Sequence, residues 1–388
     1  MHRPLCCILT CLALCAANAS DIAQDFKRDE ALWLRDPAAV AAIATIVQQG
    51  RVKRYSEEML ADGVHIETGA PTQLSAAIRS GNSTATTLIG VHGPETELRF
   101  TGSWQADLGA DFPMLVLRDG ARMTWEPQAH LDFVMDRNFF TRQLWVWGDG
   151  SGTLELAPGF VSDRTEDAQV ADAMGTIRLG GVTLLTHHSH SLPYNSRPDG
   201  RGGIYHNGHI VFEGATPSRW VVSTNAHHYA AQVDFATDGT IECRAPLTHH
   251  GQVRDCLAVG NGGPFVSSGA FRTTREAVTI TKTGPAMLSL EGQQGYRPGA
   301  RLVVAEGLLR IHSDPGAGDR YDDAAGVHLA LTVAPDARVL IAAPLVRLAR
   351  LELAAGATMW VLPGCQLTVA GEQQIDPAAT VVHEQAED

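Results

Sequence analysis

The chain has 388 residues and a formal net charge of −13 at pH 7, from 43 acidic and 30 basic side chains. This acidic balance argues against nucleic acid or an anionic membrane surface as the main partner, because both repel a negatively charged protein. A chain of this length usually divides into two or three domains, but solenoids and large all-β folds are exceptions.

The first residues have the pattern of a secretory signal peptide. Arg3 precedes the apolar run PLCCILTCLALCAA, and Ala17–Ala19 provides the small residues that signal peptidase accepts. The run is too short to span a bilayer comfortably, and the residues before Cys11 and Cys15 suit lipidation poorly. We therefore expect residues 1–19 to be a signal peptide cleaved near Ala19. The mature protein is expected to be secreted, periplasmic or extracellular, with no transmembrane segment.

One stretch predicts a helix, RDPAAVAAIATIVQQG. Asp36 is placed as N-cap, Pro37 occupies the first helical position and Gly50 stands at the stop. Val40 and Ile43 fall on one face of such a helix. A helix here would cover the open end of a stack of coils, so we expect residues 20–68 to form an N-terminal helical capping segment.

Short β-type runs replace helical signals from about Gly69 onward. Runs such as TTLIGVHG, TLELA and RLELAAGATMWVL alternate apolar and polar residues and are closed by turn residues. Many short strands with no helices between them favour parallel coils of about 20 residues. We predict an all-β fold, a right-handed parallel β-helix over residues 69–375, followed by a tail over 376–388. A large jelly roll or a propeller is the alternative.

Three of the seven cysteines lie outside the expected signal peptide: Cys243, Cys256 and Cys365. Cys243 and Cys256 could form a disulfide that closes the loop between them, or they could be stacked as small residues in a core. The sequence leaves both possibilities open, and it contains no CxxC zinc pattern.

Trp145 and Trp147, in the run QLWVWGDG, share one face of a predicted strand. They either fill the coil interior, which we favour, or form an outer platform on which a sugar ring can stack. In the second case they would be substrate-binding residues.

Histidines recur in clusters through the middle of the chain. The clusters are His187, His188 and His190; His206 and His209; His227 and His228; and His249 and His250. The steps between clusters are close to the expected coil length, so the clusters would stack as one stripe, about 4.8 Å apart, on one face of a β-helix.

The stripe has three interpretations. As a lyase site, its catalytic residues would be His209, His228, Tyr229 and Arg201, with Asn225 and Arg244 binding substrate. A neutral His or Tyr would take the C5 proton of a uronate, and an arginine would neutralise the carboxylate. As a metal site, it would use His188 and His190 from one strand face, with a third ligand from the next coil; apart from such a divalent metal we expect no cofactor. As a structural feature, it would be a ladder of polar residues at the coil corners.

The segment ITKTGPAMLSLEGQQGYRPGARLVVAEGLLRIHS, residues 280–313, resembles the autotransporter-associated β-strand repeat. The residues that match its pattern are Thr281, Lys282, Thr283, Gly284, Leu288, Leu290, Gly292, Tyr296, Gly299, Val304, Gly307 and Leu309. Ala286 stands where the family usually has glycine. The resemblance implies a β-helix of the passenger type and an extracellular role, and it implies no reaction. It covers about a tenth of the chain closely, and we expect no membrane barrel to follow it.

Two classes of function follow from these patterns. The first is a secreted surface or adhesive protein that binds a polysaccharide or cell-surface glycan, as a monomer and without catalysis. The second is a polysaccharide-degrading enzyme, a uronate lyase, with its site between Thr186 and Asp255. The repeat-like final third favours the first class, which we prefer, and the histidine stripe favours the second.

Overall fold

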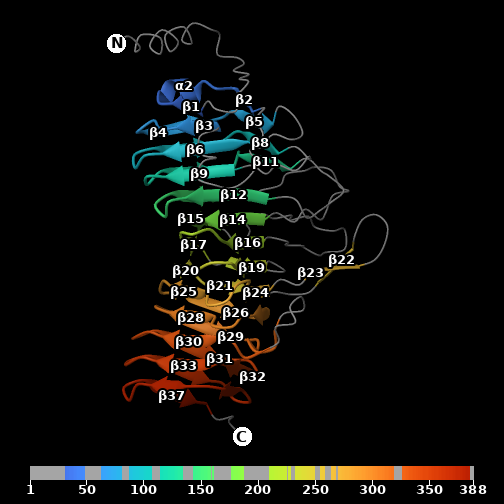
Figure 1. Cartoon of the computed structure of the whole chain (residues 1–388), viewed down its shortest axis with the longest axis vertical. Coiled ribbons are helices and arrows are strands. Elements are labelled where there is room, and N and C mark those ends of the chain that lie inside the picture. Colours follow the sequence, from blue (N-terminus) through green and yellow to red (C-terminus); the bar gives the residue numbers. More distant parts are fainter. Residues whose placement is uncertain are drawn as a thin grey trace.

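The computed structural model describes residues 31–48, 63–80, 87–106, 114–133, 143–158, 160, 176–187, 209–224, 226–228, 232–249, 254–257, 264–267, 270–318 and 326–384. Its strands wind into a right-handed parallel β-helix, whose coils stack along one axis from the N-terminal to the C-terminal end (Figure 1). The predicted fold class is therefore confirmed. Three faces enclose the interior, and we call them sheets 1, 2 and 3.

Sheet 1 has ten strands, all paired in parallel with the neighbouring coil. They are β1 (Ala31–Leu34), β3 (Gly63–Ile66), β6 (Leu88–His92), β9 (Met114–Arg118), β12 (Gln143–Gly148), β14 (Thr176–Gly180), β16 (His209–Phe212), β19 (Gln232–Phe235), β24 (Ala270–Thr273) and β27 (Gln293–Gly295).

Sheet 2 has twelve strands, also parallel, and it carries the candidate site. They are β4 (Pro71–Leu74), β7 (Glu97–Phe100), β10 (Arg122–Trp125), β13 (Thr153–Leu156), β15 (Thr183–Thr186), β17 (Ser218–Val222), β20 (Gly239–Cys243), β25 (Thr279–Thr283), β28 (Arg301–Val304), β30 (Ala330–Val333), β33 (Arg350–Leu353) and β36 (Gln373–Ile375).

Sheet 3 consists of two separate sections, of four and seven strands. The first contains β2 (Thr45–Gln48), β5 (Ala77–Ser80), β8 (Ser103–Ala106) and β11 (His130–Phe133); the second contains β18 (Ala226–His228), β21 (Leu247–His249), β26 (Met287–Leu290), β29 (Leu308–Ile311), β31 (Arg338–Ile341), β34 (Thr358–Val361) and β37 (Thr380–His383). Two further pairs are the parallel β32 (Leu345–Leu348) with β35 (Gln366–Val369), and the antiparallel β22 (Arg254–Leu257) with β23 (Pro264–Ser267).

The interior is filled by the alternate residues of each strand. In β13, Leu154 and Leu156 are buried while their neighbours are partly exposed, which is the period-two pattern of a strand with one face inward. Large side chains from successive coils stack on one another: the rings of Phe212 and Phe235 lie 4.3 Å apart at an interplanar angle of 13°. One continuous apolar core therefore runs the length of the stack.

The N-terminal helix is shorter than the sequence pattern predicted. Asp36 caps it, accepting a hydrogen bond from the backbone N–H of Ala38, and Pro37 starts it, but α2 (Pro37–Ala41) ends after five residues. The chain then enters β2, where Ile46 joins the core. The expected stop at Gly50 was wrong because pairing of β2 with β5 buries the apolar residues better than one more turn of helix would.

The coils also extend beyond the expected limits at both ends. Strands β1, β2 and β3 lie before residue 69, within the segment expected to be a helical cap, and β37 lies within the expected C-terminal tail. Among the described residues, no helix is both long and apolar enough to cross a membrane.

The segment that resembles the repeat forms β25 to β29 and the turns between them. Gly284, Gly299 and Gly307 have φ angles of +79°, +76° and +75°, as expected for glycines at tight corners, whereas Gly292 has no positive φ. The lysine of the TKTG motif points inward: Lys282 is fully buried, and its Nζ donates 2.5 Å hydrogen bonds to the backbone carbonyls of Gly284 and Glu306.

Candidate functional site

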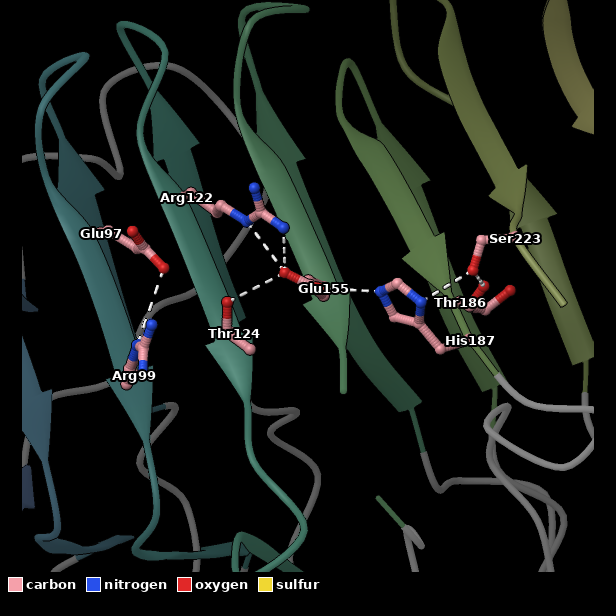
Figure 2. Close-up of polar contacts among 8 residues, drawn as sticks. All are labelled: Glu97, Arg99, Arg122, Thr124, Glu155, Thr186, His187 and Ser223. Carbon is pink, nitrogen blue, oxygen red and sulfur yellow. Dashed lines mark hydrogen bonds and ion pairs between the residues drawn. The ribbon is translucent and has the colours of Figure 1, made fainter. Parts of the chain in front are cut away.

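The outer face of sheet 2 carries charged and hydroxyl side chains in register from coil to coil. We call this surface the polar face; its members used below are Glu97, Arg99, Arg122, Thr124, Glu155, Arg219, Glu242 and Arg244. Those that lie in strands alternate with residues of the apolar core, so strand geometry points them outward, and Arg244 directly follows β20. Figure 2 shows part of this face, where neighbouring strands present Arg99, Thr124 and Glu155 at the same level.

Glu155 is the centre of the best-connected group on this face (Figure 2). One of its oxygens, Oε2, accepts hydrogen bonds from Arg122 Nε at 2.9 Å and from Thr124 Oγ1 at 3.2 Å, and it also contacts Arg122 Nη2. The other oxygen, Oε1, lies 2.5 Å from His187 Nε2. Burial alone would raise the pKa of this carboxyl, but the hydrogen bonds from Arg122 and His187 and their positive charge lower it overall. Glu155 is therefore held as a carboxylate.

His187 links Glu155 to a serine on the next coil. Thr186 ends β15 and is paired in register with Val222, the last residue of β17, so the following residues, His187 and Ser223, lie side by side. His187 Nδ1 is 2.8 Å from Ser223 Oγ, which also lies 2.9 Å from the carbonyl oxygen of Thr186. The three side chains Glu155, His187 and Ser223 thus form a continuous hydrogen-bonded row across three coils.

The protonation states of the row follow from its donors and acceptors. A carboxylate only accepts, so His187 carries a hydrogen on Nε2. In the neutral ring Nδ1 is then an acceptor, and the single hydroxyl hydrogen of Ser223 points to it. In the protonated ring Nδ1 is a donor, and the hydroxyl hydrogen turns to the Thr186 carbonyl. The serine hydroxyl therefore has one partner for each protonation state of the histidine.

The row lies on a rigid base and is open to solvent. Thr186 is buried, and its hydroxyl accepts a 3.1 Å hydrogen bond from the indole N–H of Trp220, a core residue. The side chain of His187 is 25% exposed and that of Glu155 is 12% exposed. A molecule lying on the polar face can therefore reach the imidazole and the hydroxyl while the backbone beneath them is fixed by packing.

Arg244 lies one coil beyond Ser223. Val222 and Cys243 are register partners, and the backbone N–H of Arg244 bonds the carbonyl of Val222 at 2.9 Å. Its guanidinium is held by Glu242, with Arg244 Nε 2.6 Å from Glu242 Oε1, and its side chain is 54% exposed. Arg244, which the sequence indicated as a substrate-binding residue, thus occupies the position next to Ser223 on the following coil.

Among the described residues, the histidines of the predicted stripe do not form one row. His187 follows a strand of sheet 2, His209 starts β16 in sheet 1, and His228 ends β18 in sheet 3, where it is paired in register with His249. The coils differ in length, so an even spacing in sequence does not return to the same face. His209 and His228, which the sequence indicated as catalytic residues of one site, therefore lie on strands of different sheets. His188, His190, Arg201, Asn225 and Tyr229 lie outside the described residues.

Trp145 and Trp147 point outward from sheet 1, so our preference for the coil interior was wrong. Their neighbours Leu144 and Val146 enter the core, whereas Trp145 packs with Leu88, Met114 and Val116 in a separate cluster. The two rings are nearly parallel, with centroids 6.0 Å apart. Trp145 is only 9% exposed and is covered by the guanidinium of Arg178, 4.5 Å from its ring, so Trp147 is the more accessible of the two. Their role in binding a sugar stays a prediction.

A second histidine group, which the sequence did not indicate, lies on the outer face of sheet 1. His65 Nδ1 and His92 Nε2 are 2.9 Å apart, and Trp33 stacks on His65 with ring centroids 4.7 Å apart. Gly90 makes room for them, because a Cβ there would lie 2.4 Å from His65 Nδ1. His92 Nδ1 lies 4.0 Å from Asp119. Burial lowers the pKa of His92 despite the carboxylate.

In the described parts of the chain, no three His, Cys, Asp or Glu side chains converge in a way that could hold a metal ion. The thiol of Cys243 is free and buried in the core, so it is not bridged to Cys256. Comparison with family models, with curated proteins and with solved structures gives no match for this chain. The chemistry of the polar face is therefore inferred from its own geometry.

Sequence reasoning missed Glu155 and Ser223. They lie 32 and 36 residues from His187 along the chain, in runs that carry no motif. The only local signal was His187 itself, the first histidine of THHSHS, directly after a strand.

Proposed function

We propose that the protein is an exported β-helix protein that binds a polysaccharide of low charge along the outer face of sheet 2. The observation that supports this most directly is the polar face, where guanidinium and carboxylate groups are paired on several coils of the stack. Such a surface offers donors and acceptors at a regular spacing of about 4.8 Å, the distance between stacked strands.

The chemistry of the paired groups suits a ligand rich in hydroxyls. Planar guanidinium and carboxylate groups form pairs of directed hydrogen bonds. Each retains donors or acceptors for a ligand while its position is fixed by its partner. The outer face of a long sheet is also better matched to a long polymer than to a small molecule, which usually occupies a concave pocket.

The charge pairing argues for a neutral or weakly charged chain. Each of the four arginines named above on the polar face has a carboxylate partner: Arg99 has Glu97, Arg122 has Glu155, and Arg219 and Arg244 share Glu242. A strongly anionic polymer would have to compete with these carboxylates, and the net charge of −13 would oppose its approach. This argument favours binding of a glycan over the uronate lyase alternative.

Export is supported by the signal-like N-terminus and by the resemblance of residues 280–313 to a repeat of extracellular passengers. Western blotting of periplasm, medium and cytoplasm after expression with and without residues 1–19 tests it. Retention of the full-length chain in the cytoplasm would contradict export.

Affinity gel electrophoresis tests the binding proposal. The protein would be run through gels containing xylan, mixed-linkage glucan, galactomannan, alginate or pectate. We expect retardation by at least one neutral polysaccharide, and weaker binding, by about ten-fold or more, for a double variant with Arg99→Ala and Arg219→Ala. These side chains are 59% and 48% exposed, so their loss should change stability little.

Arg338→Ala is the matched control, because Arg338 is an exposed arginine on sheet 3. Equal loss of binding in the control and the double variant would show that the polar face is not the binding surface. Migration that no polysaccharide changes would contradict the proposal. A rise in ultraviolet absorbance on incubation with alginate or pectate would instead favour the lyase.

A further inference from the structure

We propose that Ser223, His187 and Glu155 form a nucleophilic site that hydrolyses ester groups on a bound polysaccharide. The serine chemistry is inferred from the hydrogen-bonded row alone, whereas the choice of an acylated glycan as substrate rests on the proposed function. The site thus adds an activity to a surface that otherwise only binds.

The geometry is that of an activated nucleophile. A serine hydroxyl is a weak nucleophile unless a neighbouring base takes its proton, and a third group must orient that base. His187 Nδ1 lies 2.8 Å from Ser223 Oγ, within hydrogen-bond distance, and the opposite ring nitrogen is 2.5 Å from Glu155 Oε1. Because Glu155 fixes the hydrogen on Nε2, the neutral ring presents its lone pair to the hydroxyl. The nucleophile, the base and the group that orients the base are all present.

The reaction would proceed in two balanced steps. Ser223 Oγ attacks the ester carbonyl carbon while its proton moves to His187 Nδ1; the bond from carbon to the sugar oxygen then breaks, and that oxygen leaves with the proton. In the second step a water molecule attacks the acyl-serine, with its proton passing to His187 Nδ1. The bond to Ser223 Oγ breaks, the serine regains the proton, and the carboxylic acid is released.

Glu155 acts as a positioning residue in this scheme, since it contacts the base His187 but not the nucleophile Ser223. Its carboxylate fixes the ring orientation and stabilises the positive charge that the ring gains as it takes the proton. Arg122 and Thr124 hold Glu155 in turn, through hydrogen bonds of 2.9 and 3.2 Å. This support comes from strands of the solenoid, which hold side chains more rigidly than loops do.

Arg244 is placed to stabilise the negative charge of the tetrahedral intermediate. It is the next residue in the stack after Ser223, at about the 4.8 Å spacing of parallel strands. Oxyanions in acyl transfer are stabilised by donors aimed at the developing charge, and a guanidinium can provide them. The backbone N–H of Ser223 cannot serve, because it donates to the carbonyl of Thr186 at 3.0 Å.

An ester fits this site better than a glycosidic bond. Glycoside hydrolysis uses two carboxyl groups on either side of the bond, whereas the only carboxylate in the row, Glu155, is engaged by Arg122 and His187. The row is also open rather than enclosed. A small acyl group, carried on a polymer that the polar face holds, is therefore the substrate class we infer.

Labelling with a fluorophosphonate, followed by peptide mass spectrometry, tests the nucleophile directly in the full-length protein. We expect the label on Ser223, its loss in Ser223→Ala, and its loss or a reduction of at least about 100-fold in rate in His187→Gln. Thr224→Ala is the matched control, because Thr224 carries the adjacent, exposed hydroxyl, and this variant should label like the wild type. Wild-type labelling no faster than that of Ser223→Ala would overturn the proposal.

The role of Glu155 has its own readout. The labelling rate should fall in Glu155→Gln, because the uncharged amide neither fixes the hydrogen on Nε2 of His187 nor stabilises the charged ring. Glu155→Asp, which keeps the carboxylate, should restore part of the rate. Equal rates for the two variants would show that Glu155 merely supports the local structure.

Release of acetate from acetylated xylan, measured beside affinity electrophoresis on the same polymer, tests the substrate class. Labelling at Ser223 with neither binding nor acetate release would leave the serine chemistry standing and remove the glycan. Binding of the polymer without labelling at Ser223 would support the glycan and overturn the serine chemistry. The failure of one proposal can therefore be told from the failure of the other.

Discussion

Lys282 and Glu306 join two successive coils through a buried charge. The ammonium of Lys282 donates to the backbone carbonyl of Glu306 at 2.5 Å, and the side chain is fully buried. Burial lowers the pKa of this lysine, while the Cys243 thiol and the Glu306 carboxylate act in the opposite sense. The lysine of the TKTG motif thus has a structural role in this chain, because its hydrogen bonds link the turn at Gly284 to the turn at Glu306 on the next coil.

The first prediction concerns this contact. Lys282→Met keeps an unbranched side chain but removes the buried donor to the carbonyls of Gly284 and Glu306, so the free energy of unfolding should fall by about 2–3 kcal/mol. Urea unfolding followed by circular dichroism measures it. Arg301→Met, on the next coil, removes an exposed cation that pairs with Glu352 at 3.2 Å and should change stability by less than about 1 kcal/mol. Equal effects of the two substitutions would refute the role given to Lys282.

The second prediction is a pH dependence from the buried pair His65 and His92. Burial lowers the pKa of His92 below its usual 6.5, although Asp119, Glu67 and Asp149 raise it and Arg118 adds to the lowering. Just below pH 6.5, His92 therefore stays neutral in the folded protein, whereas in the unfolded chain it takes up a proton. Stability should be highest above pH 6.5 and fall as the pH drops below it, by at most about 1.4 kcal/mol per pH unit.

Comparison with His92→Gln isolates this residue, because His312, whose pKa is also lowered by burial, remains in both proteins. Denaturant unfolding at pH 7.5 and 5.5 should show a larger loss of stability for the wild type than for the variant. Parallel losses would mean that other groups cause the pH dependence.

The third prediction concerns the base of the candidate site. Thr186→Val removes the hydroxyl that accepts the indole N–H of Trp220 at 3.1 Å, and a lost partner for a buried donor costs about 1–3 kcal/mol. The melting temperature should therefore fall, whereas Thr186→Ser, which keeps the hydroxyl, should cost less. A larger drop for the serine variant would indicate that the methyl group matters more than the hydrogen bond.

The fourth prediction concerns thiol reactivity. Burial raises the pKa of the Cys243 thiol to about 12, with Lys282 opposing the rise, and the side chain is inaccessible, whereas Cys365 is partly exposed. Iodoacetamide at pH 8 should therefore modify Cys365 in the native protein and reach Cys243 only after unfolding, because the thiolate is the reactive form. Peptide mapping distinguishes the two positions. Rapid native modification of Cys243 would be incompatible with its position in the core.

The fold was predictable because it depends on local, repeated signals. The alternation of apolar and polar residues around Leu154 indicates a strand. Glycines such as Gly284 and Gly307 indicate where the chain turns. The helix was overestimated because Ile46 suits a helical stripe and a strand almost equally, and the pairing of β2 with β5 favoured the strand.

The site was not predictable because it depends on the lengths of the coils. Glu155 and Ser223 lie 32 and 36 residues from His187 along the chain. Nothing in the sequence around them indicates that these separations bring them next to His187 on neighbouring coils. An even coil of about 20 residues would have placed other side chains together. The orientation of Trp145 was also not predictable from the sequence of β12 alone. Trp145 points outward, where it packs against Met114 of the neighbouring strand.

The parallel pairing of successive coils also bears on how the chain folds. Ala330 pairs with Arg350 and Gly239 with Ile280, so partners are 20 and 41 residues apart, and apart from the hairpin of β22 with β23 every described ladder is of this non-local kind. Each ladder needs a whole circuit of chain to close before its first hydrogen bond forms. Folding should therefore be slow, in the range typical of non-local β topologies, and should grow outward from a few coils that close first. Glu155, His187 and Ser223 can meet only after two consecutive circuits have closed, from Glu155 to His187 and from His187 to Ser223. The onset of Ser223 labelling during refolding would therefore time the completion of the middle of the stack.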